Sequence, residues 1–315
     1  MKIITRQQIE KIAGSLDLIP LIEQGFVAYS QGKAVVPPVG ELLFKDPPGE
    51  VHIKYGYLTG DDCYVIKIAS GFSKNSSLGM PNNTGMMLLF SQKTGWPMGI
   101  LLDEGLLTAL RTAVAGAIAA KYLAPKKVRC IGIVGTGNQG LLQLRHLKPV
   151  VACRDVLVWG IHREKAEHFA AEMRLDGYSI QAAASVAEIG GTCNLIVTTT
   201  PSHEPLLLDE HVQKGTHITA IGSDTPEKQE LDSRILARAD LVVADSIEQC
   251  LLRGEIHQAL KRKLIQKKNL AELGDVIQGR ASRRDNDDQI TVADLTGVAV
   301  QDLQIAKAVY HCGLF

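Results

Sequence analysis

The chain has 315 residues, and its 34 basic and 34 acidic side chains give a formal net charge of zero. This balance argues against nucleic acid as a partner, because nucleic-acid-binding domains carry a basic excess. A hydrophobic content of 45% and a charged content of 22% are typical of a soluble globular protein. The longest apolar runs are too short for a membrane span, so no membrane partner is expected.

The cysteines and the N-terminus favour a cytoplasmic protein. The six cysteines are scattered without a C-x-x-C pair, and the segment from Met1 to Arg6 contains no signal-peptide core. We therefore expect reduced, buried thiols, and the sequence indicates no metal site.

The first hundred residues predict helices followed by strands. Apolar side chains recur at three- and four-residue steps over 6–31, which predicts helix, and Pro20 is expected to divide this stretch into two helices. Residues 51–102 show the alternation of β-strands and contain four of them. Four strands in about 50 residues predict a separate β-rich domain.

The loop Thr59-Gly60-Asp61-Asp62 fixes the register of the first predicted hairpin. In a symmetric register, Lys54 lies opposite Lys67 on the same face of the sheet. Like charges in this arrangement are unfavourable. One interpretation is that an anion lies between the two lysines, and the other is that both point to solvent.

A glycine turn then follows a long alanine-rich helix, predicted over 104–123, in which Arg111 would ordinarily be solvated. Cys130 to Val134 form a short apolar strand, and Gly135, Gly137 and Gly140 follow in G-x-G-x-x-G spacing before a helical pattern. Strand, glycine turn and helix together predict a dinucleotide site, because the first two glycines permit a tight turn and close approach of a pyrophosphate. The alternative is a turn without a ligand.

From residue 130 onward, strands and helices alternate. Strands are expected near 130–134, 155–159, 194–198, 217–221 and 240–244, which predicts an α/β fold with a Rossmann-type doubly wound parallel sheet. After the second strand, no acidic residue precedes His162-Arg163. This favours NADP(H) over NAD(H), because Arg163 can meet a 2′-phosphate, although it can equally begin the next helix as an exposed residue.

Two later strands end in polar side chains. One ends in Thr198, Thr199 and Thr200, and the next is followed by Asp224. The carboxyl ends of strands face the ligand crevice in open α/β sheets, so Asp224 is a candidate for chemistry. Its alternative role is to cap the following helix or turn. A last helix, near 298–312, lies beyond the alternation and is expected to return to the first domain.

Seven segments together resemble the ornithine cyclodeaminase/mu-crystallin family, which also holds archaeal-type alanine dehydrogenases and ketimine reductases. The resemblance covers nearly the whole chain. The segments are Val65-Ile66-Lys67, Leu110-Arg111-Thr112, Gly135-Thr136-Gly137-Asn138-Gln139, Val197-Thr198-Thr199-Thr200-Pro201, Ile221-Gly222-Ser223-Asp224, Lys228-Gln229-Glu230-Leu231 and Thr296-Gly297-Val298-Ala299-Val300-Gln301-Asp302.

The resemblance implies a homodimer joined through its β-rich domains, a nicotinamide cofactor and an amino or imino acid substrate. It implies that Lys67 and Asp224 are the active-site lysine and aspartate, and that Arg111 lies near the cofactor phosphates and the substrate. Lys54 stands where the family commonly has a carboxylate-binding arginine, and Asn82 where it has a threonine. The cofactor-binding residues expected from motifs and resemblance are Asn82, Arg111, Thr112, Gly135, Gly137, Asn138, Gln139, His162, Arg163, Thr198, Thr199, Thr200, Ile221, Gly222, Lys228 and Val298.

The predicted function is NAD(P)H-dependent reduction of a C=N bond beside a carboxylate, giving an amino acid, and reversible as a dehydrogenase. The first alternative is an ornithine cyclodeaminase, which the short chain disfavours. The second is a non-catalytic binder of NADPH or a small ligand, which the intact Lys67 and Asp224 disfavour. The predicted domains are 1–118 with 300–315 for substrate binding and dimerisation, and 119–299 for the dinucleotide.

Overall fold

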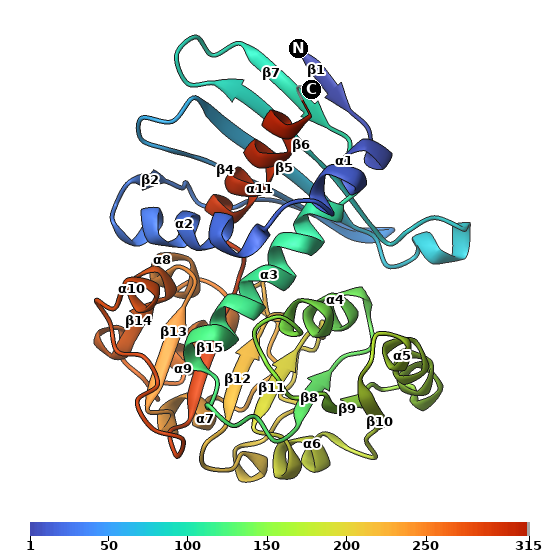
Figure 1. The fold of residues 1–315 in the computed structure, drawn as a ribbon, viewed down its shortest axis with the longest axis vertical. Coiled ribbons are helices and arrows are strands. Elements are labelled where there is room, and N and C mark those ends of the chain that lie inside the picture. The colour runs from blue at the N-terminus through green and yellow to red at the C-terminus, as the bar shows by residue number, and fades with distance from the viewer. Residues whose placement is uncertain (314–315) are drawn as a thin grey trace. The chain divides into compact units, whose positions relative to one another are not determined.

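The computed structural model describes residues 1–313, which form two compact units. The first unit runs from Met1 to Arg111 and resumes at Val298, and the second is Thr112–Gly297. The change from one unit to the other falls after Arg111, inside helix α3, Leu106–Leu123, and the boundary predicted after residue 118 lies in the same helix. Figure 1 shows the elements of each unit.

The first unit is built on a seven-stranded sheet of order β1-β7-β6-β5-β4-β2, with β3 also paired to β4. All pairings are antiparallel except that of β1 with β7. The four predicted strands are confirmed as β4 to β7, whereas β1 to β3 were not foreseen. The strands are β1 Lys2–Ile4, β2 Ala34–Val35, β3 Gly40–Lys45, β4 Pro48–Leu58, β5 Cys63–Gly71, β6 Asn83–Ser91 and β7 Pro97–Leu101.

Helices α1 (Arg6–Ala13), α2 (Leu18–Ser30) and α11 (Ala299–Cys312) complete this unit, with a short 3-10 helix at Asn75–Leu78. The last helix packs against α2, β4 and β5, as Figure 1 shows in red, so its expected return to the first domain is confirmed. The prediction that Pro20 divides the first two helices was wrong. Pro20 lies in the first turn of α2, where its missing N–H breaks no intrahelical hydrogen bond.

The second unit contains eight parallel strands in the order β10-β9-β8-β11-β12-β15-β13-β14. From β8 the chain proceeds outward through β9 and β10, then returns to the other side of β8 with β11. This confirms the doubly wound α/β fold and places the switch point between β8 and β11. The strands are β8 Ile131–Val134, β9 Asp155–Trp159, β10 Ser179–Ala182, β11 Leu195–Thr198, β12 His217–Ala220, β13 Leu241–Ala244, β14 Leu270–Glu272 and β15 Thr291–Asp294.

The helices of the second unit are connections between these strands. They are α4 Asn138–Leu147, α5 Arg163–Leu175, α6 Val186–Thr192, α7 Ser233–Arg238, α8 Ile247–Cys250, α9 Gly254–Lys261 and α10 Leu273–Gln278, with 3-10 helices at Asp209–His211 and Lys267–Asn269. The apolar strand residues Ile196, Ile218 and Val292 are wholly buried in the core. Helix α3 is long and apolar enough to cross a membrane by length and composition, but 61% of it is buried in the protein, which is typical of a core helix.

Candidate active site

The predicted hairpin register is confirmed: Lys54 of β4 lies directly opposite Lys67 of β5. The two residues are 5% and 2% exposed, so the interpretation that both point to solvent is wrong. Burying two opposed ammonium groups is costly unless carboxylates or an anion compensate them. The buried face of this sheet therefore carries two adjacent cationic side chains, which need a compensating negative charge.

A carboxylate from the last helix joins this pair. Asp302 of α11 lies 3.3 Å from the Lys67 Nζ and 2.9 Å from the Arg111 Nε. Arg111 is buried, and besides this ion pair its Nη1 donates a hydrogen bond to the Gln301 Oε1 at 3.0 Å, so it is not the solvated helix residue that its position alone suggested. Asp302 was missed as a site residue, although the last of the resembling segments ends on it.

The surroundings of Lys67 lower the pKa of its ammonium group to near neutral pH. Burial is the largest cause, the Arg111 guanidinium the next, and Lys54 adds to it, so that the pKa of Lys67 falls to about 7 although Asp302 opposes the shift. Burial acts to raise the pKa of Asp302, but Arg111 and the two lysines hold it below its usual range. Lys67 can therefore exchange a proton near neutrality, while Asp302 stays ionised.

Besides Arg111, two expected cofactor residues, Asn82 and Val298, belong to the first unit. Asn82 is exposed, and its Oδ1 accepts a hydrogen bond from the Ser76 backbone N–H at 2.9 Å within the same loop. Val298 is buried and precedes the first turn of α11. Their predicted contacts with a cofactor stay predictions.

The glycine turn has the geometry that a pyrophosphate requires. Gly135 adopts a φ of 119°, and its N–H donates to the Trp159 carbonyl at 2.8 Å. A Cβ on Gly135 would lie 2.5 Å from the Thr199 hydroxyl, whereas a Cβ on Gly137 would meet no atom within 4 Å. The space over Gly137, ahead of the Asn138 and Gln139 amides at the start of α4, fits a dinucleotide phosphate.

Backbone hydrogen bonds join the carboxyl ends of three adjacent strands, β8, β11 and β12. The Thr199 N–H donates to the Val134 carbonyl at 2.8 Å, and the Ile221 N–H donates to the Thr198 carbonyl at 3.0 Å. The predicted hydroxyl residues of β11 therefore lie beside the glycine turn on one side and the Gly222 loop on the other. This is the edge at which open α/β sheets bind ligands.

Asp224 lies in that last loop and is ion-paired. Its Oδ1 is 2.8 Å from the Lys228 Nζ, and its carbonyl accepts a hydrogen bond from Arg253 at 3.2 Å. The next helix, α7, begins at Ser233 and is capped by Asp232, so Asp224 does not cap a helix. Lys228, expected among the cofactor residues, is held here by Asp224.

Exposed basic side chains follow strand β9. His162 is the N-cap residue of α5, and Arg163 pairs with Glu167 at 3.0 Å in an exposed i, i+4 pair. Such pairs contribute little to stability, so Arg163 remains available to another anion.

Thr112, at the start of the second unit, accepts at its carbonyl a hydrogen bond from Gln143 at 3.1 Å. Within residues 1–313, no group of three or more candidate ligands could hold a metal ion.

A doubly wound parallel sheet with an open glycine turn at its switch point defines a dinucleotide-binding α/β protein. The chain belongs to the ornithine cyclodeaminase/mu-crystallin family, whose model matches residues 1–312. It is 37% identical over 314 residues to the alanine dehydrogenase of Archaeoglobus fulgidus, covering 99% of this chain and 95% of that protein.

Two solved structures of the same family share the fold over the whole chain. An archaeal alanine dehydrogenase dimer with bound NAD superposes with a TM-score of 0.91 at 34% identity, covering 100% of this chain and 96% of that one. The Delta(1)-pyrroline-2-carboxylate reductase of Thermococcus litoralis, in complex with NADH and L-proline, gives 0.93 at 30% identity, covering 100% and 98%. The family resemblance expected from the sequence is thus confirmed.

Proposed function

We propose that this protein is an NAD(P)H-dependent reductase of an imino acid, reversible as an amino acid dehydrogenase. The observation that carries the proposal is the buried set of Lys54, Lys67 and Arg111 around Asp302. Repulsion among these cations contributes to the lowered pKa of Lys67, and a substrate carboxylate would relieve it. Relatives that act on such substrates, including the proline-bound reductase, support this assignment.

The chemistry divides between cofactor and protein. The bound nicotinamide would supply a hydride to the carbon of the C=N bond, and the nitrogen would take a proton. Lys54 and Lys67 would hold the carboxylate through charge-assisted hydrogen bonds. Lys67 would also donate or relay the proton, and Asp224 would hold the imine nitrogen in its more electrophilic protonated form.

For the cofactor, we propose a preference for NADP(H) over NAD(H). The end of β9 offers His162 and Arg163 and no acidic residue before Glu164, so that the position where an acid would bind the ribose hydroxyls is basic. Arg163 would exchange Glu167 for the 2′-phosphate. The ratio of kcat/KM with the two cofactors tests this, and a clear preference for NADH contradicts it.

We also propose a cytoplasmic homodimer. All six cysteines are free thiols, as expected in a reducing compartment. On the face of the first unit's sheet opposite Lys67, a row of apolar residues crosses five strands in register: Tyr55, Ile66, Leu88, Ile100 and Ile3. Contiguous apolar surface of this kind marks a protein interface.

One set of assays separates the candidate functions. The purified protein is mixed with NADPH or NADH and with pyrroline-2-carboxylate, or with pyruvate plus ammonia, and cofactor oxidation is followed. Ornithine with NAD is tested in parallel for proline and ammonia. Oxidation with either imino acid supports the proposal, proline from ornithine assigns the cyclodeaminase instead, and cofactor binding without turnover in any assay assigns a binding protein.

A further inference from the structure

A single buried carboxylate links the loops that follow two adjacent strands of the second unit. Glu230 is 0% exposed, and each of its oxygens accepts one backbone and one hydroxyl hydrogen bond. Its Oε1 accepts from the Thr200 N–H at 2.5 Å and from the Thr200 hydroxyl at 2.7 Å. Its Oε2 accepts from the Thr198 hydroxyl and from the Gly222 N–H, both at 2.8 Å.

These donors are the residues at the ligand edge of the sheet. Thr198 is the last residue of β11, Thr200 lies in the loop that follows it, and Gly222 lies in the loop after β12 that also carries Asp224. A Cβ on Gly222 would lie 2.0 Å from the Thr200 carbonyl oxygen and 2.7 Å from the Glu230 Oε2. The two loops therefore approach each other as closely as backbone allows, and the Glu230 carboxylate bridges them.

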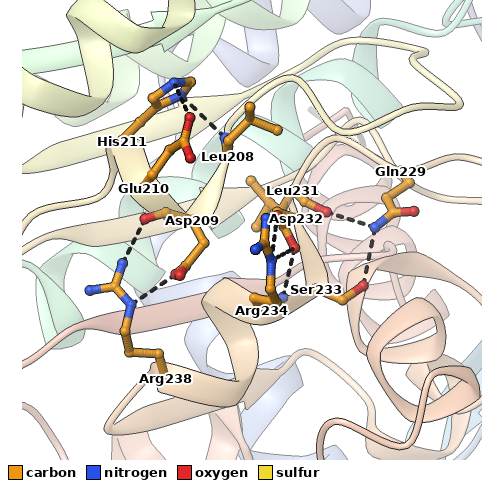
Figure 2. A network of polar contacts seen from close by, with 10 residues as sticks. All are labelled: Leu208, Asp209, Glu210, His211, Gln229, Leu231, Asp232, Ser233, Arg234 and Arg238. Carbon is orange, nitrogen blue, oxygen red and sulfur yellow. Dashed lines mark hydrogen bonds and ion pairs between the residues drawn. The ribbon is translucent and has the colours of Figure 1, made fainter.

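The segment around Glu230 is itself held in place. Its N–H donates to the Glu255 carboxylate at 2.7 Å, and its carbonyl accepts from the Leu206 N–H at 2.8 Å. The neighbouring Gln229 donates to the Leu231 carbonyl and the Ser233 hydroxyl, as Figure 2 shows. These hydrogen bonds fix the position of the Glu230 carboxylate. The carboxylate in turn fixes the positions of its four donors.

Burying a carboxyl group in order to join two loops costs free energy of folding. Burial raises the pKa of Glu230 to about 7, although all four hydrogen bonds act to lower it. Replacing a buried charge by apolar contacts is often neutral or stabilising, so fold stability alone does not explain it. Four acceptor positions at one point are what a carboxylate offers and an apolar or amide side chain does not.

We propose that Glu230 is a positioning residue, whose carboxylate holds Thr198 to Thr200 and Gly222 to Asp224 in the arrangement that binds the nicotinamide cofactor. This inference rests on the proposed cofactor use. Glu230 acts through the two loops rather than on the reacting atoms. Thr199, between the two bonded threonines, also lies against Gly135 of the glycine turn, so displacement of this loop would reach the pyrophosphate cradle.

The test is direct binding of NADH and NADPH to Glu230→Gln, followed by fluorescence and independent of turnover. Whichever oxygen becomes the amide NH2, one backbone N–H, of Thr200 or of Gly222, loses its acceptor, because each oxygen holds one. The threonine hydroxyls can turn to accept, but the backbone cannot. We expect the dissociation constant of the preferred cofactor to rise about tenfold or more, which corresponds to about 1.4 kcal/mol.

Asn194→Ala is the matched control. Asn194 is also buried and also ties loops, through hydrogen bonds with Arg129 and Lys127, but at the amino end of β11. It should lower the melting temperature comparably while changing cofactor affinity by less than about twofold. Cofactor binding by Glu230→Gln as in the wild type, or equal loss of binding in Asn194→Ala, overturns the proposal.

Thr198→Val keeps the test open if Glu230→Gln does not fold. The valine is nearly isosteric and removes only the hydroxyl that Glu230 accepts. Thr198 is 0% exposed and its hydroxyl donates to Glu230, so this hydroxyl does not face a ligand directly. Weaker cofactor binding in this variant therefore supports the positioning role, and unchanged binding contradicts it. Failure of the proposed function is seen separately, as absence of imino acid reduction by the wild-type protein.

Discussion

At the scale of single residues, the pair of opposed lysines has the most direct consequence. Lys54→Met removes one cation from the buried set and one charge-assisted hydrogen bond to a substrate carboxylate, worth on the order of 1.5–3 kcal/mol. We expect KM for the imino acid to rise about ten- to a hundredfold, with cofactor affinity nearly unchanged. Steady-state kinetics with each substrate varied in turn measure this. Lys54→Arg, which keeps the charge, is the control, and an unchanged KM in Lys54→Met would contradict the carboxylate clamp.

Lys67 should impose a pH dependence on the reduction. Its pKa is about 7, so it is protonated below that pH and loses its proton as the pH rises through it. Reduction consumes a proton and needs the cationic clamp, so log kcat/KM in this direction should fall above about pH 7, reporting the free enzyme. In Lys67→Arg the side chain stays charged, and this limb should disappear while the rate drops. Persistence of the limb in the variant would assign it to another group.

At the scale of elements, the features that the sequence predicted correctly are those that depend on a short stretch of chain. The Lys54–Lys67 register follows from a four-residue loop, and the glycine turn follows from three glycines after an apolar strand. Strands β10, β14 and β15 were missed, because none of them contains the run of three consecutive apolar residues that marks predicted strands of similar length such as β11 and β13.

The residues that the sequence did not reveal have distant partners. Asp302 meets Lys67 and Arg111 only because α11 returns to the first sheet, and Glu230 meets Thr200 from 30 residues away. Both were visible as acidic residues within resembling segments, but no local pattern indicates which acids become buried. Tertiary packing alone decides that.

The glycine turn itself can be tested at this scale. A Cβ on Gly137 meets no protein atom within 4 Å, so Gly137→Ala should fold normally. The methyl group would instead occupy the approach of the pyrophosphate, and cofactor affinity should fall about tenfold or more, the effect of about 1.4 kcal/mol. Thermal unfolding and cofactor titration measure the two effects. Gly191→Ala, which is equally unobstructed, should change neither, and wild-type affinity in Gly137→Ala would show that nothing binds over this turn.

At the scale of the whole molecule, the two faces of the first sheet differ in composition and in exposure. One face buries Val65, Lys67, Met87 and Leu89. The other carries the in-register apolar row and leaves Tyr55 and Met86 39% and 37% exposed. A sheet face with this composition would be an aggregation risk if it stayed in water. In the proposed homodimer, a second copy of the chain would cover this face.

Charges placed on that face should therefore separate the subunits. In Tyr55→Glu/Met86→Glu, both side chains are already partly exposed, so each subunit should keep its fold, whereas a paired copy would have to bury the carboxylates. We expect the wild type to be a dimer and the variant a monomer, measured by size-exclusion chromatography with light scattering. Leu175→Glu, which changes an 89% exposed residue of the second unit, should remain dimeric. A monomeric wild type, or a variant that stays dimeric, would show that this face is not the subunit interface.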